Sequence, residues 1–292
     1  MKKHKLMAWG IAVAAATGSL SAQATTIDLT GAGNSDTING ATYTQVAPQP
    51  AGSGVLGSFV RIQTNDGIEQ GYNTTVNGTY DNNGANTFNR QITVGQIGFI
   101  DLNGAIAGGE VMRFLLDINQ ANSTKNDNKS KLNLDEVQLY LSRDPNQSIE
   151  PVLAQGQTIP FTNSTLLYQM DLGGDNLVML DGALNPGSGI GDMFLDIPLS
   201  AFMTAFGAGG YATAAARNGA YIYLYSRFGS GDNENTSGYE EWAAIEGTAL
   251  PCNPAVEECE GGETGIPEPG SLALLGLGLA AAGYFRRKKH HH

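Results

Sequence analysis

The sequence predicts an all-β, extracytoplasmic domain of the β-sandwich or jelly-roll class, with one short helix. About ten short apolar segments are separated by turn-forming residues at intervals of roughly 10–20 residues, which is typical of sandwiches. Glycine is abundant at 39 residues while charged residues make up only 15 % of the chain, as in turn-rich exported proteins. No internal repeat of fixed period is present, so the pattern does not favour a solenoid.

The expected elements follow in chain order. One or two strands are expected within residues 25–54, and residues 65–87 form a loop with Asn-Gly turns. The residues from 198 to 206, with Pro198 near the start, predict the short helix. The alternation of apolar residues slips by one position at Asp135-Glu136, which indicates a β-bulge. The remaining expected strands are 55–64, 88–100, 111–118, 132–141, 166–171, 176–180, 193–197, 220–228 and 239–245.

Residues 1–24 have the three parts of a secretory signal peptide. A basic start is followed by a short apolar stretch from 6 to 16 and by the small residues Ala22-Gln23-Ala24. We expect recognition by the secretion translocon and cleavage after Ala24, because the apolar stretch is too short to span a bilayer comfortably.

Charge is unevenly distributed along the chain. All 28 acidic residues lie between positions 25 and 285, whereas seven of the 16 basic residues lie outside that range, so the exported part is more negative than the whole-chain charge of −12. Such a surface repels nucleic acids and attracts cations or basic partners. Nucleic-acid binding is therefore not expected.

The composition changes near residue 250. We place the folded domain at 25–249 and an acidic linker at 250–265. Cys252 and Cys259 lie in this linker, and an exported protein reaches an oxidising compartment. Their spacing predicts a local disulfide bond.

Residues 266–292 form a tail with three parts. They are Pro267-Glu268-Pro269, an apolar segment over 272–285 that predicts a hydrophobic helix, and a basic end. Fourteen helical residues extend about 21 Å, less than the ~30 Å of a bilayer core, so the helix is short for a permanent anchor. A basic end is expected to stay on the cytoplasmic side. The basic residues are Arg286, Arg287, Lys288 and Lys289.

This tail resembles the PEP-CTERM sorting signal of Gram-negative bacteria in the order and spacing of all three parts. The resemblance implies transient insertion in the inner membrane and recognition by an exosortase, a membrane-embedded cysteine protease-transpeptidase. It further implies cutting near Pro267–Pro269 and transfer to the envelope or extracellular matrix, where family members accompany exopolysaccharide and biofilm production. The alternative is a tail anchor that is never cut. The terminal His290–His292 depart from the usual ending.

The expected exported domain lacks the residues of common active sites. Histidine occurs only at His4 and at 290–292, which excludes His-dependent triads and His-ligated zinc within 25–249. We therefore expect a non-enzymatic surface or matrix protein, and the resemblance to the PEP-CTERM sorting signal implies its association with exopolysaccharide. The adjacent carboxylates Asp135-Glu136 and Glu240-Glu241 leave a carboxylate-only glycoside hydrolase as the least favoured alternative.

Two binding sites follow from the residue pattern. Asp117 and Asn119 end one strand and Asp135 and Glu136 lie on the next, a set of oxygen donors that suits Ca²⁺, the one cofactor suggested here. A solvated hairpin without a bound ion is the other interpretation of these residues, and the one that the sequence favours.

The second site is a tyrosine row. Tyr221, Tyr223 and Tyr225 alternate and so share one strand face. Exposed, they would stack on sugar rings in a carbohydrate-binding module, which could depend on calcium; buried, they belong to the core, the interpretation that we favour.

Overall fold

The structure is a computed structural model that describes residues 24–252 except 48–54, 65–66, 85, 103–108, 121–128, 155, 188 and 232–237. The predicted tail helix and most of the predicted signal peptide lie outside these residues. In the part of the chain that is described, no helix is both long and apolar enough to cross a membrane.

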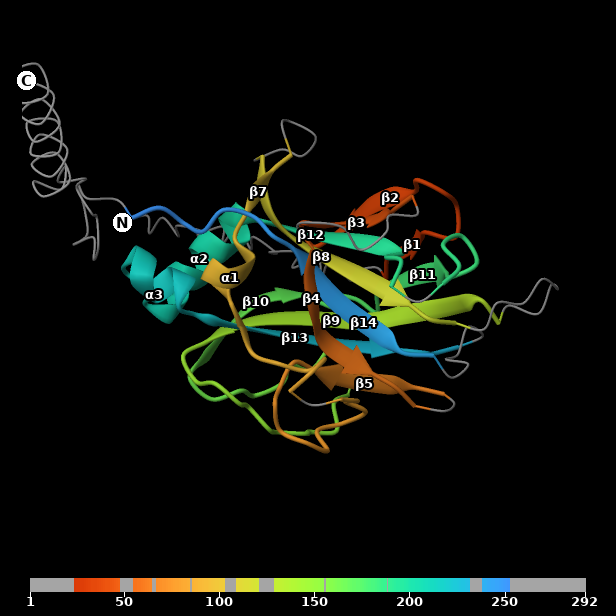
Figure 1. Cartoon of the computed structure of the whole chain (residues 1–292), viewed down its shortest axis with the longest axis horizontal. Coiled ribbons are helices and arrows are strands. Elements are labelled where there is room, and N and C mark those ends of the chain that lie inside the picture. Colours follow the sequence, from red (N-terminus) through yellow and green to blue (C-terminus); the bar gives the residue numbers. More distant parts are fainter. Residues whose placement is uncertain are drawn as a thin grey trace, which may run out of the picture.

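Two seven-stranded β-sheets pack against each other, which confirms the all-β class (Figure 1). All strand pairs described are antiparallel except β1 with β11. Sheet A has the order β1 (Thr26–Asp28), β11 (Leu177–Asp181), β9 (Lys131–Ser142), β13 (Tyr221–Phe228) and β5 (Glu69–Tyr72), with β10 (Ser164–Gln169) beside β9 and β6 (Ile92–Thr93) beside β13. Sheet B has the order β2 (Ser35–Ile38), β3 (Ala41–Gln45), β12 (Met193–Pro198), β8 (Glu110–Ile118), β14 (Glu240–Ile245) and β4 (Val55–Ile62), with β7 (Ile100–Asp101) beside β8.

The main core lies between the sheets, and buried polar links join the sheets across it. Trp242 of β14 is fully buried, and its Nε1–H donates to Ser226 Oγ of β13 at 3.0 Å. Tyr43 of β3 and Tyr168 of β10 share a hydrogen bond of 2.8 Å between their hydroxyl groups. Because buried polar groups need partners, these bonds fix how the two sheets face each other.

The central strands of sheet A are buried on both faces. Every residue of β9 after Lys131 is buried, and β13 is buried except at Tyr221 and Arg227. The predicted bulge is confirmed, because Arg227 pairs with Glu136 but Phe228 pairs with Leu134, which leaves Asp135 as the extra residue.

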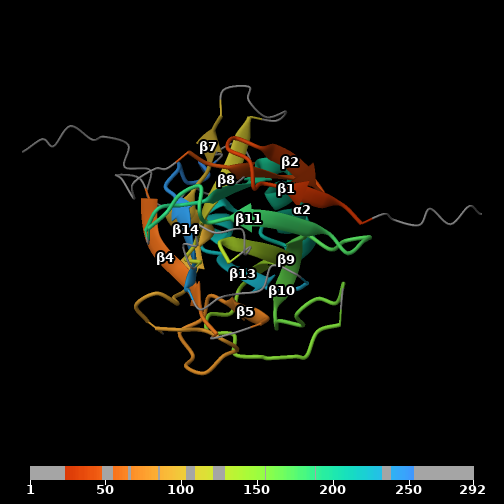
Figure 2. The same cartoon turned by 90° about the vertical axis from the view of Figure 1, so that its right-hand side faces the viewer.

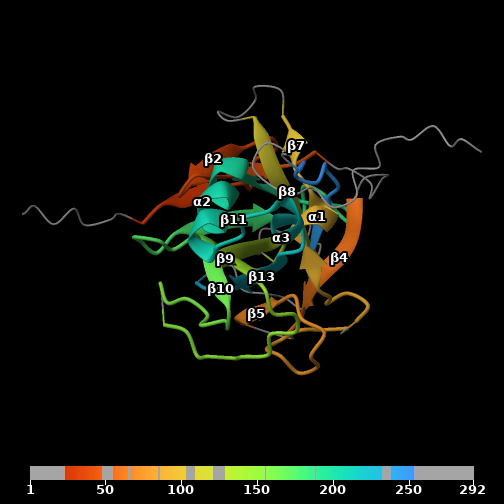
Figure 3. The same cartoon turned by 90° about the vertical axis from the view of Figure 1, so that its left-hand side faces the viewer.

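Helices gather at one end of the sandwich, on the left of Figure 1 and facing the viewer in Figure 3. The predicted helix is α2 (Leu199–Gly209), which follows Pro198 and ends at Gly210 in the left-handed conformation that favours glycine. Its residues Phe202 and Phe206 enter the core.

Three expectations about the elements were incomplete or wrong. The strand expected over 88–100 is interrupted by α1 (Val94–Ile97), because Thr93 and Gln96 form a capping box that starts a helical turn. Strand β5 and α3 (Ala214–Asn218) were not expected. Only glycine fits at position 71 of β5, because a Cβ there would lie 2.4 Å from Ile62 Cγ2.

Candidate functional site

The outer face of sheet A carries a second, smaller core made mostly of aromatic side chains. Phe161 lies at its centre, with its ring centroid 4.8 Å from that of Tyr72, 4.9 Å from Tyr140 and 5.0 Å from Tyr223. Phe161 belongs to a covering loop, residues 143–154 and 156–163, which lies beneath sheet A together with the loop after β5 (Figures 1 and 2). The buried members are Tyr72, Tyr140, Ile159, Phe161, Tyr223 and Tyr225.

Tyrosine hydroxyl groups attach the covering loop to the sheet. Tyr72 Oη donates to the carbonyl of Ile149 at 3.0 Å, and Tyr223 Oη donates to that of Asp144 at 2.9 Å. Tyr80, in the loop after β5, donates to the carbonyl of Pro151 at 2.7 Å. Each bond satisfies a loop carbonyl, which explains how a segment without regular structure is held against a sheet.

The tyrosine row therefore has the role favoured from the sequence. Tyr223 and Tyr225 are 0 % and 1 % exposed, and only Tyr221 is partly exposed. A sugar ring cannot stack on the two buried rings while the covering loop is in place. Ile222 and Leu224, on the opposite face of the same strand, fill the main core, so β13 is buried on both faces.

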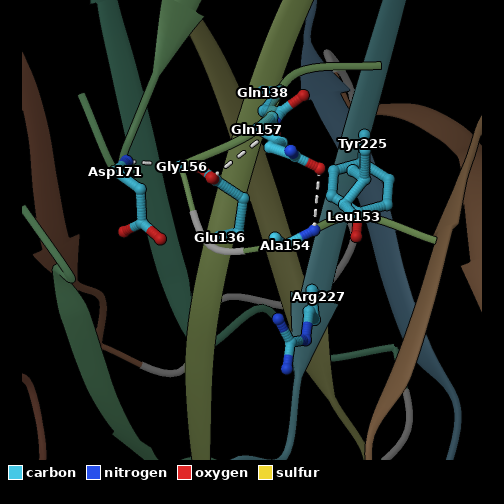
Figure 4. Close-up of a pocket in the computed structure, with 9 residues that line it drawn as sticks. All are labelled: Glu136, Gln138, Leu153, Ala154, Gly156, Gln157, Asp171, Tyr225 and Arg227. Carbon is cyan, nitrogen blue, oxygen red and sulfur yellow. Dashed lines mark hydrogen bonds between the residues drawn. The ribbon is translucent and has the colours of Figure 1, made fainter. Parts of the chain in front are cut away.

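Beyond the aromatic residues, the same face becomes polar and lines a small, partly open cavity of about 10 Å³, room for about one water molecule. Figure 4 shows Glu136 of β9, Asp171 just after β10 and Arg227 of β13 around it. The Asp171 N–H donates to Glu136 Oε1 at 3.3 Å, and Gln138 Nε2 donates to Glu136 Oε2 at 3.3 Å. The carboxylates thus face a polar but nearly filled space.

Burial raises the pKa values of the carboxyl groups that line this cavity. It raises the pKa of Glu136 to about 7, with a further increase from the nearby Asp171 carboxylate. Burial also raises the pKa of Asp171 to about 6. Paired carboxyl groups with raised pKa values are typical of acid–base sites, but this cavity is too small for a sugar.

An open groove adjoins the cavity and shares Leu153 and Arg227 with it. It has a volume of about 420 Å³. Exposed apolar side chains flank it, with Ile68 48 % and Val152 98 % exposed, while Tyr80 and Glu150 add aromatic and acidic surface. This lining combines apolar and hydrogen-bonding groups, as ligand sites do.

The sequence did not single out the groove residues Tyr80 and Arg227. Arg227 continues the alternation of the tyrosine row, so spacing alone could have placed it on the same strand face as the tyrosines. Tyr80 has a positive φ of 49°, which is uncommon for a bulky residue and is not encoded by any local motif.

The calcium site predicted from the sequence is not formed by the described side chains. Asp117 ends β8 in sheet B and Asn119 follows it, whereas Asp135 and Glu136 lie in β9 of sheet A, since the chain crosses between sheets here instead of forming a hairpin. Asp135 instead accepts a hydrogen bond from the Ser230 N–H at 2.9 Å. Among the described residues, no three His, Cys, Asp or Glu side chains are grouped to hold a metal ion.

The other predicted site residues lie at the ends of the chain. Cys252 is disulfide-bonded, while Cys259 lies outside the described residues, so their pairing stays a prediction. The predicted cleavage residue Ala22, the Pro267–Pro269 triplet and the basic residues 286–289 are also outside the described part.

Comparison with known proteins identifies the tail. Residues 265–289 match the PEP-CTERM protein-sorting motif, as the sequence predicted. The motif supports an exosortase-sorted secreted protein and indicates export, with transient sorting at the membrane toward the cell surface. No curated protein matches the chain.

Proposed function

We propose that the exported domain is a non-enzymatic protein of the cell envelope or extracellular matrix that binds exopolysaccharide through the groove beside the covering loop. The observation that carries this proposal is the groove itself, a site of about 420 Å³ that joins exposed apolar residues to polar ones. Sugars present apolar ring faces and hydroxyl groups together, so they suit such a lining.

The sorting motif supports the location. A protein delivered to the cell surface meets extracellular polysaccharide there, and the motif implies processing by an exosortase. We propose that cutting occurs near Pro267–Pro269 and that the signal peptide is removed after Ala24. Intact mass of the protein recovered from its host tests both, since an uncut form retaining Arg286–Lys289 would contradict the cleavage.

Binding is tested with exposed residues, so that folding is preserved. The full chain is titrated with exopolysaccharide purified from its host, beside Ile68→Ser/Val152→Ser. Removing two apolar contacts is expected to weaken binding about tenfold, equivalent to about 1.4 kcal/mol. The matched control is Leu172→Ser, at a residue that is 64 % exposed and outside the groove. Equal loss in both variants, or no binding by the unaltered chain, would contradict the proposal.

A carboxylate-only glycoside hydrolase is the competing function, supported by the raised pKa values of Glu136 and Asp171. Against it, the shared cavity holds about one water molecule rather than a sugar. Release of reducing sugar from the same polysaccharide, abolished by Glu136→Gln, would favour the hydrolase.

A further inference from the structure

Three buried oxygen atoms near the end of β8 have no hydrogen-bond partner among the described residues. They are Oδ1 of Asp117, Oδ1 of Asn185 and Oδ1 of Asp192. Their residues are 8 %, 2 % and 3 % exposed. Buried acceptors are nearly always satisfied by protein, water or an ion, so these three atoms require an explanation. The carboxyl end of β8 lies toward the right of Figure 1.

Backbone hydrogen bonds hold the two carboxylates next to each other. The Asp192 N–H donates to the carbonyl of Leu116 at 2.7 Å, and the Ile118 N–H donates to Asp192 Oδ2 at 2.8 Å. Asp192 therefore contacts the residues on both sides of Asp117. The Gly189 N–H binds the other oxygen of Asp117, Oδ2, at 2.6 Å.

The carboxamide of Asn185 is held by two backbone carbonyls that belong to neighbours of Asp192. Its Nδ2 donates to the carbonyls of Gly191 at 2.8 Å and Val46 at 2.9 Å, and the Val46 N–H donates to the carbonyl of Asp192 at 3.0 Å. Both amide hydrogens are used in this way, so the remaining oxygen is available only as an acceptor.

The surroundings add negative charge. The side chains whose charge raises the pKa of these carboxyl groups are acidic: Glu241 acts on Asp117, while Asp117 and Asp181 act on Asp192. Burial is the larger cause, and the pKa of Asp192 is raised to about 8. Two buried carboxylates side by side are costly unless a proton or a cation neutralises at least one of them.

We propose that Asp117, Asn185 and Asp192 bind a calcium ion through their three free Oδ1 atoms. Ca²⁺ accepts carboxylate, carboxamide, backbone-carbonyl and water oxygens in flexible geometry, so a set of two carboxylates and one amide can be completed by carbonyls and water. The absence of nitrogen and sulfur donors from the set disfavours zinc. Asp117 was also in the set expected from sequence, but its partners come from the loop before β12 instead of from β9.

The test is thermal unfolding of the full chain with CaCl₂ or with EDTA. Calcium at well above its dissociation constant is expected to raise the Tm by about 5 °C, because it binds only the folded state. Asp192→Asn should abolish that rise while remaining at least as stable as the unaltered chain in EDTA, since it removes a buried charge but keeps the shape. The matched control Asp171→Asn, at a similarly buried aspartate just after β10, should keep the rise.

Luminescence of bound Tb³⁺ is a second measurement, which still tests the site if the Asp192→Asn variant does not fold. Trp242 lies opposite Leu116 in the sheet, next to Asp117, so excitation of tryptophan should sensitise bound Tb³⁺. Luminescence that Ca²⁺ displaces, and that Asp117→Asn lacks, supports the site. An unaltered chain whose Tm and Tb³⁺ luminescence do not respond to calcium overturns it, as does an Asp192→Asn chain that responds normally.

Discussion

The outer faces of the two sheets are completed in different ways. On sheet A, a covering loop is attached through tyrosine hydroxyl groups, so aromatic rings are buried and carboxyl groups are enclosed. On sheet B, arginine side chains lie over partly exposed aromatic rings. Arg113, for example, lies 4.2 Å above the ring of Phe194 and forms an ion pair with Asp196. Ordering a loop costs conformational entropy, but it creates low-dielectric spaces that an open face does not have. The groove and the raised pKa values of Glu136 and Asp171 are found on the covered face, whereas the raised pKa values of Asp117 and Asp192 belong to the end of β8 in sheet B.

Removing a tyrosine from the covered face should have the largest effect on stability. Tyr223→Ala is expected to lower the free energy of unfolding by about 4 kcal/mol, because it leaves a cavity beside Phe161 and removes the bonds to Asp144 and Gln147. Urea denaturation measures this. Tyr221→Ala, on the same face of the same strand but partly exposed, should cost about 1 kcal/mol. Equal costs would show that the covering loop does not bury this face in solution.

On sheet B, the corresponding test breaks the ion pair of Arg113. Its Nε and Nη2 each donate to Asp196 at 2.7 Å, and Asp196 is 2 % exposed. Arg113→Met should cost about 3 kcal/mol because a buried carboxylate loses its partner. Adding Asp196→Asn should recover much of that loss, and a double variant no better than the single one would contradict this account. Urea denaturation of both variants gives the comparison.

How far the sequence could predict this difference depends on the range of each interaction. Alternation placed Tyr221, Tyr223 and Tyr225 on one face and located the bulge at Asp135, because both follow from neighbouring residues. It did not indicate that the covering loop lies on that face, since the loop has no periodic apolar pattern. Alternation also could not show that β8 and β9 belong to different sheets. Both strands are buried along nearly their whole length, so either strand could lie at the centre of either sheet.

The burial of Glu136 on sheet A also predicts that the free energy of unfolding depends on pH. The pKa of Glu136 is raised in the folded state to about 7, so folding takes up a proton and the associated stability is full below about pH 4.5. It is lost as the pH rises toward 7. Glu136→Gln should therefore be more stable than the unaltered chain by about 2 kcal/mol at pH 8, with little gain at pH 4. Denaturation of both chains across this pH range measures the difference, and a gain of equal size at pH 4 and pH 8 would contradict this account.

The smallest expected effect separates attachment of the loop from the shape of the groove. Tyr80→Phe removes the hydroxyl group that donates to the Pro151 carbonyl but keeps the ring that lines the groove. We expect a loss of about 1 kcal/mol in the free energy of unfolding, typical of one hydrogen bond. Limited proteolysis should show faster cutting in the covering loop, while affinity for polysaccharide changes less than twofold. If affinity falls as much as in Ile68→Ser/Val152→Ser, the position of the loop, rather than the apolar lining, determines binding.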